Sequence, residues 1–110
     1  MITANYKSIV NKLKFEGRAF INGKYVDAID GQKFENINPA TGDVLCSVAK
    51  CNHKDVDLAV KVSRKAFESG IWSRTSPEFR KDILLKFAEL LRQHGEDNSV
   101  LECVDTGKLI

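Results

Sequence analysis

The spacing of apolar residues changes near residue 52, where an alternating pattern gives way to a helical one. Alternation is typical of strands, and a spacing of three to four residues is typical of amphipathic helices. A further apolar helical face precedes the strands, within residues 1–17, and consists of Ile2, Tyr6, Ile9, Val10 and Leu13. The pattern therefore predicts an N-terminal amphipathic extension, two antiparallel hairpins and then about three helices, which is an α+β arrangement.

Two turn sequences position the hairpins. Asn22-Gly23 separates Ala19–Ile21 from Lys24–Val26 and supplies the two positive-φ residues of a type I′ turn. The second hairpin is expected to consist of a strand at Phe34–Ile37, a turn at Pro39–Gly42 and a strand at Val44–Ala49. Proline lacks the N–H that a strand ladder requires, so it is expected in the turn.

Capping residues predict the bounds of the two long helices. Asn52 and Asp55 have the spacing of a capping box, and Gly70 is expected to end the helix that they begin. Ser76 has the position of an N-cap for the next helix, with Pro77 at the first helical position, where proline is tolerated.

Both long helices carry an apolar face, and we expect the helices to form a helical hairpin after the strands. The first face is a stripe of small and apolar residues, namely Val56, Ala59, Val60, Ser63, Ala66 and Phe67. The second face is broader, and we expect its main core residues to be Phe79, Leu84, Phe87 and Leu91.

A third, shorter helix is predicted around Val100, Leu101 and Val104. Gly95 is expected to break the preceding helix, and Gly107 suits the left-handed residue that follows a helix C-terminus. Lys108 would then face the unpaired carbonyls of the last turn.

The composition is that of an ordinary globular protein of 110 residues, with a formal charge of +2 and charged residues along the whole chain. This balance argues against a nucleic-acid partner, and no apolar run approaches the roughly 20 residues that span a bilayer. Cys46, Cys51 and Cys103 are an odd set without a preceding secretory signal, which indicates free, buried thiols in the cytoplasm. Cys46, Cys51 and His53 as zinc ligands are a weaker alternative, because their spacing matches no zinc pattern.

No motif in the chain carries chemistry of its own. The sequence contains no dinucleotide-binding glycine pattern, no P-loop and no zinc-protease motif. Ser76 is explained as a helix cap, and His53 and His94 are expected at helix ends on the surface. From the residues alone we therefore assign no catalytic and no cofactor-binding residue.

Five strings, in order and at fitting distances, resemble the aldehyde dehydrogenase superfamily. They are FINGKYVDA (20–28), ENINPATGDVL (35–45), DVDLAVKVSRKAF (55–67), GIWSRTSPEFRKDILLKFAELL (70–91) and LECVDTGKLI (101–110). The SPEFRK string and the leading helix most resemble bacterial enzymes that act on γ-glutamyl-γ-aminobutyraldehyde. The resemblance implies that residues 18–110 are the first part of a Rossmann-like α/β cofactor-binding domain, with residues 1–17 as an extension.

The resemblance also implies a reaction, the oxidation of an aldehyde to a carboxylic acid with NAD or NADP. In the family the nucleophilic cysteine, the general-base glutamate and the cofactor loop all follow the point where this chain stops. The three cysteines present do not match the nucleophile's motif. We therefore expect the 110-residue chain to be inactive alone and to bind neither cofactor nor aldehyde.

A monovalent cation site is the one family feature implied within this segment. It would use backbone carbonyls of Asn36 and Ile37 and the carboxylate of Asp105. Oxygen ligands of this kind suit hard cations. The alternative is that Asp105 is a helix-end residue bonded to nearby amides.

Three explanations of the chain follow. The first is a fragment of an aldehyde dehydrogenase, which the apolar end at Leu109-Ile110 favours. The second is a non-catalytic interaction module derived from the family, and the third is an unrelated structural domain. Because two short hairpins cannot cover both apolar helix faces, we also expect the chain to self-associate.

Overall fold

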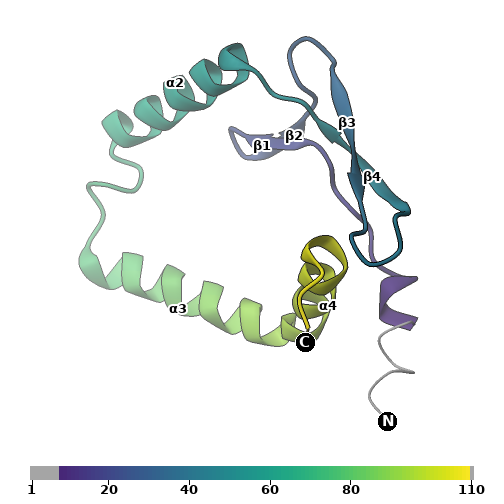
Figure 1. Ribbon diagram of the computed structural model, residues 1–110. Coiled ribbons are helices and arrows are strands. Elements are labelled where there is room, and N and C mark those ends of the chain that lie inside the picture. The colour runs from purple at the N-terminus through teal and green to yellow at the C-terminus, as the bar shows by residue number, and fades with distance from the viewer. Residues whose placement is uncertain (1–7, 110) are drawn as a thin grey trace.

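Two separate antiparallel hairpins form the first half of the molecule (Figure 1). The computed structural model describes residues 8–109, so Ile2 and Tyr6 of the predicted N-terminal face lie outside the described residues. The first hairpin pairs β1 (Ala19–Ile21) with β2 (Lys24–Val26), and the second pairs β3 (Lys33–Ile37) with β4 (Val44–Ala49). Both predicted hairpins are confirmed.

The turn between β1 and β2 has the predicted type I′ backbone. Asn22 has φ 55° and Gly23 has φ 75°, so both central residues are in the left-handed region. Phe20 and Tyr25 lie opposite each other across the hairpin, with ring centroids 5.1 Å apart in an edge-to-face arrangement. The local sequence therefore fixes both the turn and the strand register.

Gly17 allows the N-terminal segment to lie directly against β4. Residues 8–10 are helical, and the chain then runs to Gly17, whose carbonyl accepts a hydrogen bond of 2.7 Å from the Ala49 amide. A Cβ atom on residue 17 would lie only 2.0 Å from the carbonyl oxygen of Ser47. Only glycine fits this close approach of two backbones without displacing one of them.

Three helices follow the hairpins, and their caps are largely as predicted. They are α2 (His53–Ser69), α3 (Pro77–Gln93) and α4 (Gly95–Thr106). Asn52 forms the capping box with Asp55, Ser76 caps α3, and Gly107 follows α4 with φ 76°.

At the start of α4 the expected break is confirmed, and at its end one prediction is wrong. The preceding helix α3 ends at Gln93, His94 separates the two helices, and Gly95 is the first residue of α4. The Lys108 ammonium donates to the Glu102 carboxylate at 2.5 Å instead of facing the last carbonyls. The carboxylate carries a full charge and therefore attracts the ammonium more strongly than a carbonyl dipole does.

A buried carboxylate joins the hairpins to the helices. The Asp55 side chain is only 3% exposed, and its two oxygens accept hydrogen bonds of 2.9 Å from the Asn52 amide and the Ile29 amide. The Asn52 side chain in turn donates to Asp30 at 2.9 Å. These backbone hydrogen bonds favour the ionised form and hold the pKa of Asp55 below its ordinary value.

The predicted helical core is not buried. Phe79, Leu84, Phe87 and Leu91 have exposed fractions of 49%, 59%, 57% and 48%. Among the described residues, the buried apolar side chains are Ile21, Ala28 and Val100. The expectation that these four residues form the main core is therefore wrong, because residues 8–109 leave about half of each of these side chains exposed.

The elements form an open ring and not a closed globule (Figure 1). The two long helices diverge from the loop that joins them, so the predicted helical hairpin is wrong; α2 contacts β1, and α3 contacts α4. The radius of gyration is 17.7 Å, whereas a compact chain of this length has about 13 Å. No helix in the described part of the chain is long and apolar enough to cross a membrane.

The Asp55 junction predicts a pH dependence of stability. Its pKa is lower in the folded state than the ordinary value of about 3.9, so the ionised carboxylate stabilises the fold above that pH. This contribution is lost as the pH falls through the folded-state pKa. Urea unfolding at several pH values should show an acid loss of stability that Asp55→Asn reduces. The exposed neighbour Asp57 provides the control, since Asp57→Asn should leave the acid loss unchanged.

Gly17→Ala should lower the free energy of unfolding by about 1–3 kcal/mol, because the new methyl group overlaps the β4 backbone. Gly95→Ala is the matched control, since a Cβ atom there meets nothing within 4 Å and the residue is helical. Equal unfolding curves for the two variants would contradict the close approach at Gly17.

Candidate functional site

The predicted cation-site residues come together where β3 ends beside the C-terminus of α4. The Asn36 side-chain amide donates a hydrogen bond of 2.5 Å to Oδ1 of Asp105, across 69 positions of sequence. The strand pairing is irregular between Asn36 and Ile37, which shifts the register at this point. Asn36 is half-buried, whereas Ile37 and Asp105 are exposed. The structure thus places all three residues in one small region.

The atoms at this place fit a hard cation in chemistry. Carboxylate and carbonyl oxygens are the preferred ligands of such ions, and Oδ2 of Asp105 accepts no hydrogen bond from residues 8–109. The hydrogen bond from the Asn36 side-chain amide already satisfies Oδ1 of the Asp105 carboxylate. The cation site and the alternative of an amide-bonded Asp105 both stay open, although the amide belongs to a distant side chain and not to the helix end.

A second contact supports the same junction. Gly107 lies against the turn after β3, where an added Cβ atom would be 3.1 Å from Cγ of Pro39. Asn38 orders this turn by two hydrogen bonds. Its side-chain oxygen accepts from the Ala40 backbone amide at 2.9 Å, and its backbone amide donates to the Asp43 carbonyl. The end of α4 therefore docks on a preformed turn, which brings Asp105 to Asn36.

The three cysteines are free thiols. Cys46 in β4 and Cys103 in α4 are half-buried, whereas Cys51 is exposed, so the expectation of a buried thiol is wrong for Cys51. Partial desolvation, together with the negative charges of Asp55 and Asp30, raises the pKa of Cys51. A thiol of this kind is mostly protonated at neutral pH and reacts slowly as a nucleophile.

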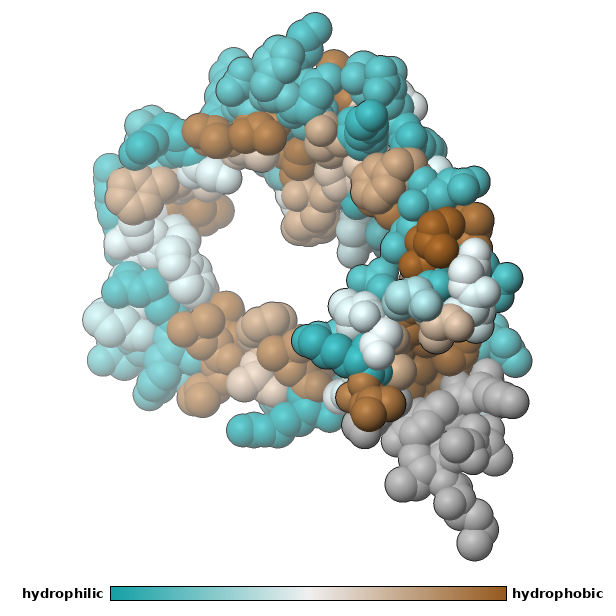
Figure 2. Space-filling view, viewed as in Figure 1, coloured by the Kyte–Doolittle hydropathy of each residue, from teal (hydrophilic) through white to brown (hydrophobic). Residues whose placement is uncertain are grey.

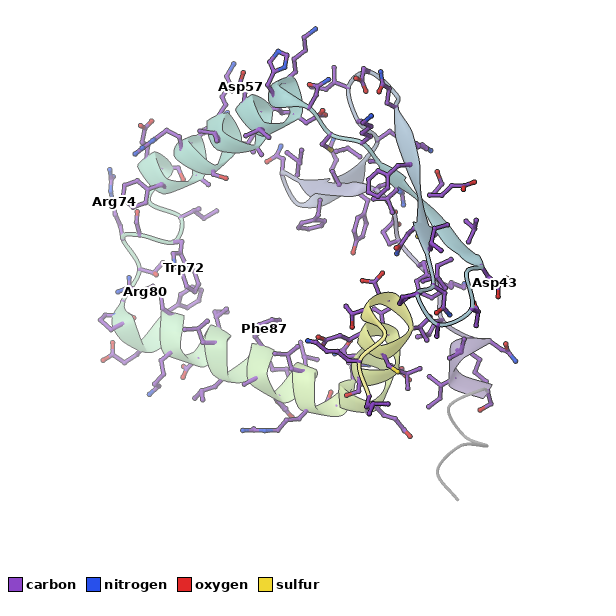
Figure 3. All side chains as sticks on the ribbon, viewed as in Figure 1. Asp43, Asp57, Trp72, Arg74, Arg80 and Phe87 are labelled. Carbon is purple, nitrogen blue, oxygen red and sulfur yellow. The ribbon has the colours of Figure 1, made fainter. Side chains whose placement is uncertain are left out.

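The described residues hold no cluster of histidine, cysteine and carboxylate side chains suited to a metal ion. His53 and His94 are both exposed at helix ends. Figure 3 shows Asp57 and Arg74 on the outer side of the ring, far from one another. These polar residues form no common site.

Sequence reasoning missed two open grooves along α2. One has a volume of about 460 Å³ and is lined by Ala59, Val60, Ser63, Arg64 and Phe67. The other, about 280 Å³, lies between α2 and the first hairpin and includes Ile21, Leu58 and Val62. Leu58 and Val62, four residues apart, form a second apolar helix face, and this spacing was the signal available in the sequence.

Similar proteins of known type match nearly the whole chain. The profile described as aldehyde dehydrogenase family matches residues 25–110. Aldehyde dehydrogenase 1 of Tanacetum cinerariifolium is 50% identical over 104 residues, which is 94% of this chain and 21% of that protein.

Solved structures share the backbone as well. Indole-3-acetaldehyde dehydrogenase of P. syringae, in complex with NAD+, superposes with a TM-score of 0.89 at 42% identity, covering 92% of this chain and 20% of that one. Gamma-glutamyl-gamma-aminobutyraldehyde dehydrogenase of Burkholderia cenocepacia gives a TM-score of 0.89 at 40% identity, with the same coverage of 92% and 20%. The resemblance to the enzymes of this subfamily is therefore confirmed.

The chain spans about a fifth of the length of the curated relatives that it matches. Its hairpins and helices are the first part of the Rossmann-like fold of those relatives, as the sequence predicted. The family profile, the sequence identity and the shared backbone agree, and the chain belongs to the aldehyde dehydrogenase family.

Proposed function

We propose that this chain is the N-terminal portion of an NAD(P)-dependent aldehyde dehydrogenase that oxidises an aldehyde to a carboxylic acid. The match of residues 25–110 to the family, over only a fifth of the relatives' length, is the observation that carries the proposal. The P. syringae relative was solved with NAD+, which supports a nicotinamide cofactor for the whole enzyme.

We propose further that these 110 residues contribute no group to the chemical step. Oxidation of an aldehyde through a thiohemiacetal requires a thiolate, and none of the three cysteines here matches the motif of the family's nucleophile. Desolvation and the charges of Asp55 and Asp30 raise the pKa of Cys51 and therefore disfavour its thiolate. Free thiols also favour a cytoplasmic location.

The role that we assign to the chain in the whole enzyme is structural support. The contact between Asn36 and Asp105 holds the end of α4 against β3 and gathers oxygen atoms that suit a monovalent cation. Such a cation would link the strand end to the helix end by the same residues. The ion would therefore stabilise the region without entering the reaction.

A non-catalytic interaction module is the second candidate. The exposed apolar residues on α2 and α3 favour some partner for the isolated chain. The nucleotide sequence beyond the codon for Ile110 separates the two candidates. A continuing aldehyde dehydrogenase reading frame supports the first, and a natural stop codon there supports the second.

The isolated chain should oxidise no aldehyde. A turnover assay that follows NADH or NADPH formation with several aldehydes is the measurement, with a full-length aldehyde dehydrogenase as the positive control. Activity that is abolished by Cys103→Ala would overturn the proposal that these residues lack the active site.

The isolated chain should also self-associate, because its accessible surface of 8849 Å² exceeds the roughly 6100 Å² of a compact monomer of this mass. Sedimentation equilibrium over a wide concentration range measures the association. A stable monomer at all concentrations would count against a truncated fold and would favour the interaction module.

A further inference from the structure

The tip of the first hairpin carries the Asn22-Gly23 pair. Among the asparagines of the sequence, only Asn22 precedes a glycine. Both residues are exposed, and a Cβ atom on Gly23 would meet nothing within 4 Å. The hairpin projects toward the central opening of the ring (Figure 1), and this opening stays free in the space-filling view (Figure 2). Water therefore has direct access to the peptide bond between the two residues.

An asparagine followed by glycine can deamidate with water as the only other reactant. The backbone nitrogen of the glycine attacks Cγ of the asparagine, the side-chain nitrogen takes up the proton and leaves as ammonia, and a cyclic succinimide is formed. The attack is favoured at glycine, which has no side chain to shield its nitrogen.

Water then opens the succinimide at one of its two carbonyl groups. Cleavage between the nitrogen and Cγ gives aspartate. Cleavage between the nitrogen and the backbone carbonyl carbon gives isoaspartate, whose main chain runs through Cβ and Cγ. In sum, asparagine and water give a carboxylic acid and ammonia without a change of oxidation state.

The turn that the pair forms holds the reacting atoms apart. Asn22 has φ 55° and Gly23 has φ 75°, as in a type I′ turn. In such a turn ψ of the first central residue is about +30°, which places the following nitrogen nearly anti to Cβ across the Cα–C bond. Ring closure requires this nitrogen to be nearly eclipsed with Cβ. Asn22 must therefore leave the turn conformation before it reacts.

The hairpin that maintains this turn is small. β1 and β2 have three residues each and form a two-stranded sheet of their own. Two-stranded hairpins are marginally stable in water. The edge-to-face contact of Phe20 and Tyr25 supports the pairing, and both rings are more than half exposed. Local opening of this hairpin therefore does not require unfolding of the remaining chain.

We propose that Asn22-Gly23 is the site of spontaneous deamidation in this chain and that opening of the β1–β2 hairpin controls the rate. The inference is independent of the proposed function, because it uses only the turn and its hairpin. The two products differ in their effect on the fold. Aspartate keeps the turn, since Asp-Gly also suits type I′, whereas isoaspartate adds one backbone atom to a two-residue loop and disturbs the strand register.

The isoaspartate form should also loosen the contact between the hairpin and α2. Asn22 lines a groove of about 310 Å³ together with Val62 and Lys65 of α2. Ile21, the residue before it, is only 9% exposed. A change in the main chain next to a buried side chain moves that side chain, so the modification acts on the junction of the hairpin and the helix.

Mass spectrometry of the full 110-residue chain, incubated at neutral pH, tests the site. Trypsin releases residues 19–24 as a peptide with one asparagine, and deamidation raises its mass by about 1 Da. Electron-transfer fragmentation distinguishes isoaspartate from aspartate. We expect Asn22 to react before any other asparagine. Asn38 is the internal control, because Pro39 has no N–H with which to attack.

A comparison of the folded and the unfolded chain tests the control by the hairpin. In guanidinium chloride the reaction at Asn22 should be at least about tenfold faster, because the turn no longer restrains it. In the folded chain Tyr25→Ala should accelerate it roughly two- to fivefold, since a cross-strand partner is lost. Phe34→Ala in the second hairpin is the matched control, because Phe34 is 52% exposed and Tyr25 is 51% exposed. It should leave the rate at Asn22 unchanged.

Asn22→Asp separates the added charge from the added backbone atom. Hydrogen exchange of the amides in residues 19–26 should be the same in Asn22→Asp as in the unreacted chain. It should be at least about tenfold faster in the isoaspartate fraction of the aged chain, because the turn is lost there. The amides of β3 and β4 should exchange alike in all three forms.

Several results would overturn the proposal. Equal rates at Asn22 in the folded and the unfolded chain contradict control by the hairpin, and so does equal acceleration, or none, by Tyr25→Ala and Phe34→Ala. Earlier deamidation of an asparagine outside residues 19–24 contradicts the site. Equally fast exchange in Asn22→Asp and in the isoaspartate form would assign the structural effect to charge and not to the backbone.

Discussion

The arrangement of hairpins and helices depends on the hydrogen bonds of one buried carboxylate. The Asp55 carboxylate accepts hydrogen bonds from the backbone amides of Asn52, at the start of α2, and of Ile29, after β2. One side chain therefore joins two segments that are far apart in sequence. Few large apolar side chains are buried among residues 8–109, and directional polar contacts therefore determine the geometry. The ionised form accepts these bonds, and they lower the pKa of Asp55 although burial acts to raise it.

Local features of the fold were predictable because their causes are local. The Asn22-Gly23 turn, the Asn52 and Ser76 caps and the glycine after α4 each follow from backbone preferences within a few residues. The burial of Phe87 and its neighbours was not predictable in the same way. Periodicity shows that a helix has an apolar face, but it cannot show whether the partner of that face is part of the same 110 residues.

The Asn36–Asp105 junction also shows that local features were predictable from the sequence, whereas long-range contacts were not. No local pattern relates two residues 69 positions apart, and only the resemblance to a family placed them together. The structure explains how they meet: Asn38 and Asp43 order the turn after β3, and Gly107 allows the end of α4 to approach Pro39 closely. The close backbone approach at Gly17 was likewise not predictable, because no local sequence pattern indicates that β4 lies next to residue 17.

These two kinds of contact explain how an open ring can keep a family shape. Turns, caps and the Asp55 and Asp105 contacts fix the directions of the elements, whereas apolar burial supplies most of the free energy that holds a domain together. In this chain the turns, caps and polar contacts are present, whereas little apolar surface is buried, because the apolar faces of α2 and α3 remain exposed. The geometry of this segment is therefore set mainly by turns, caps and polar contacts, and the exposed apolar faces add little burial to its stability.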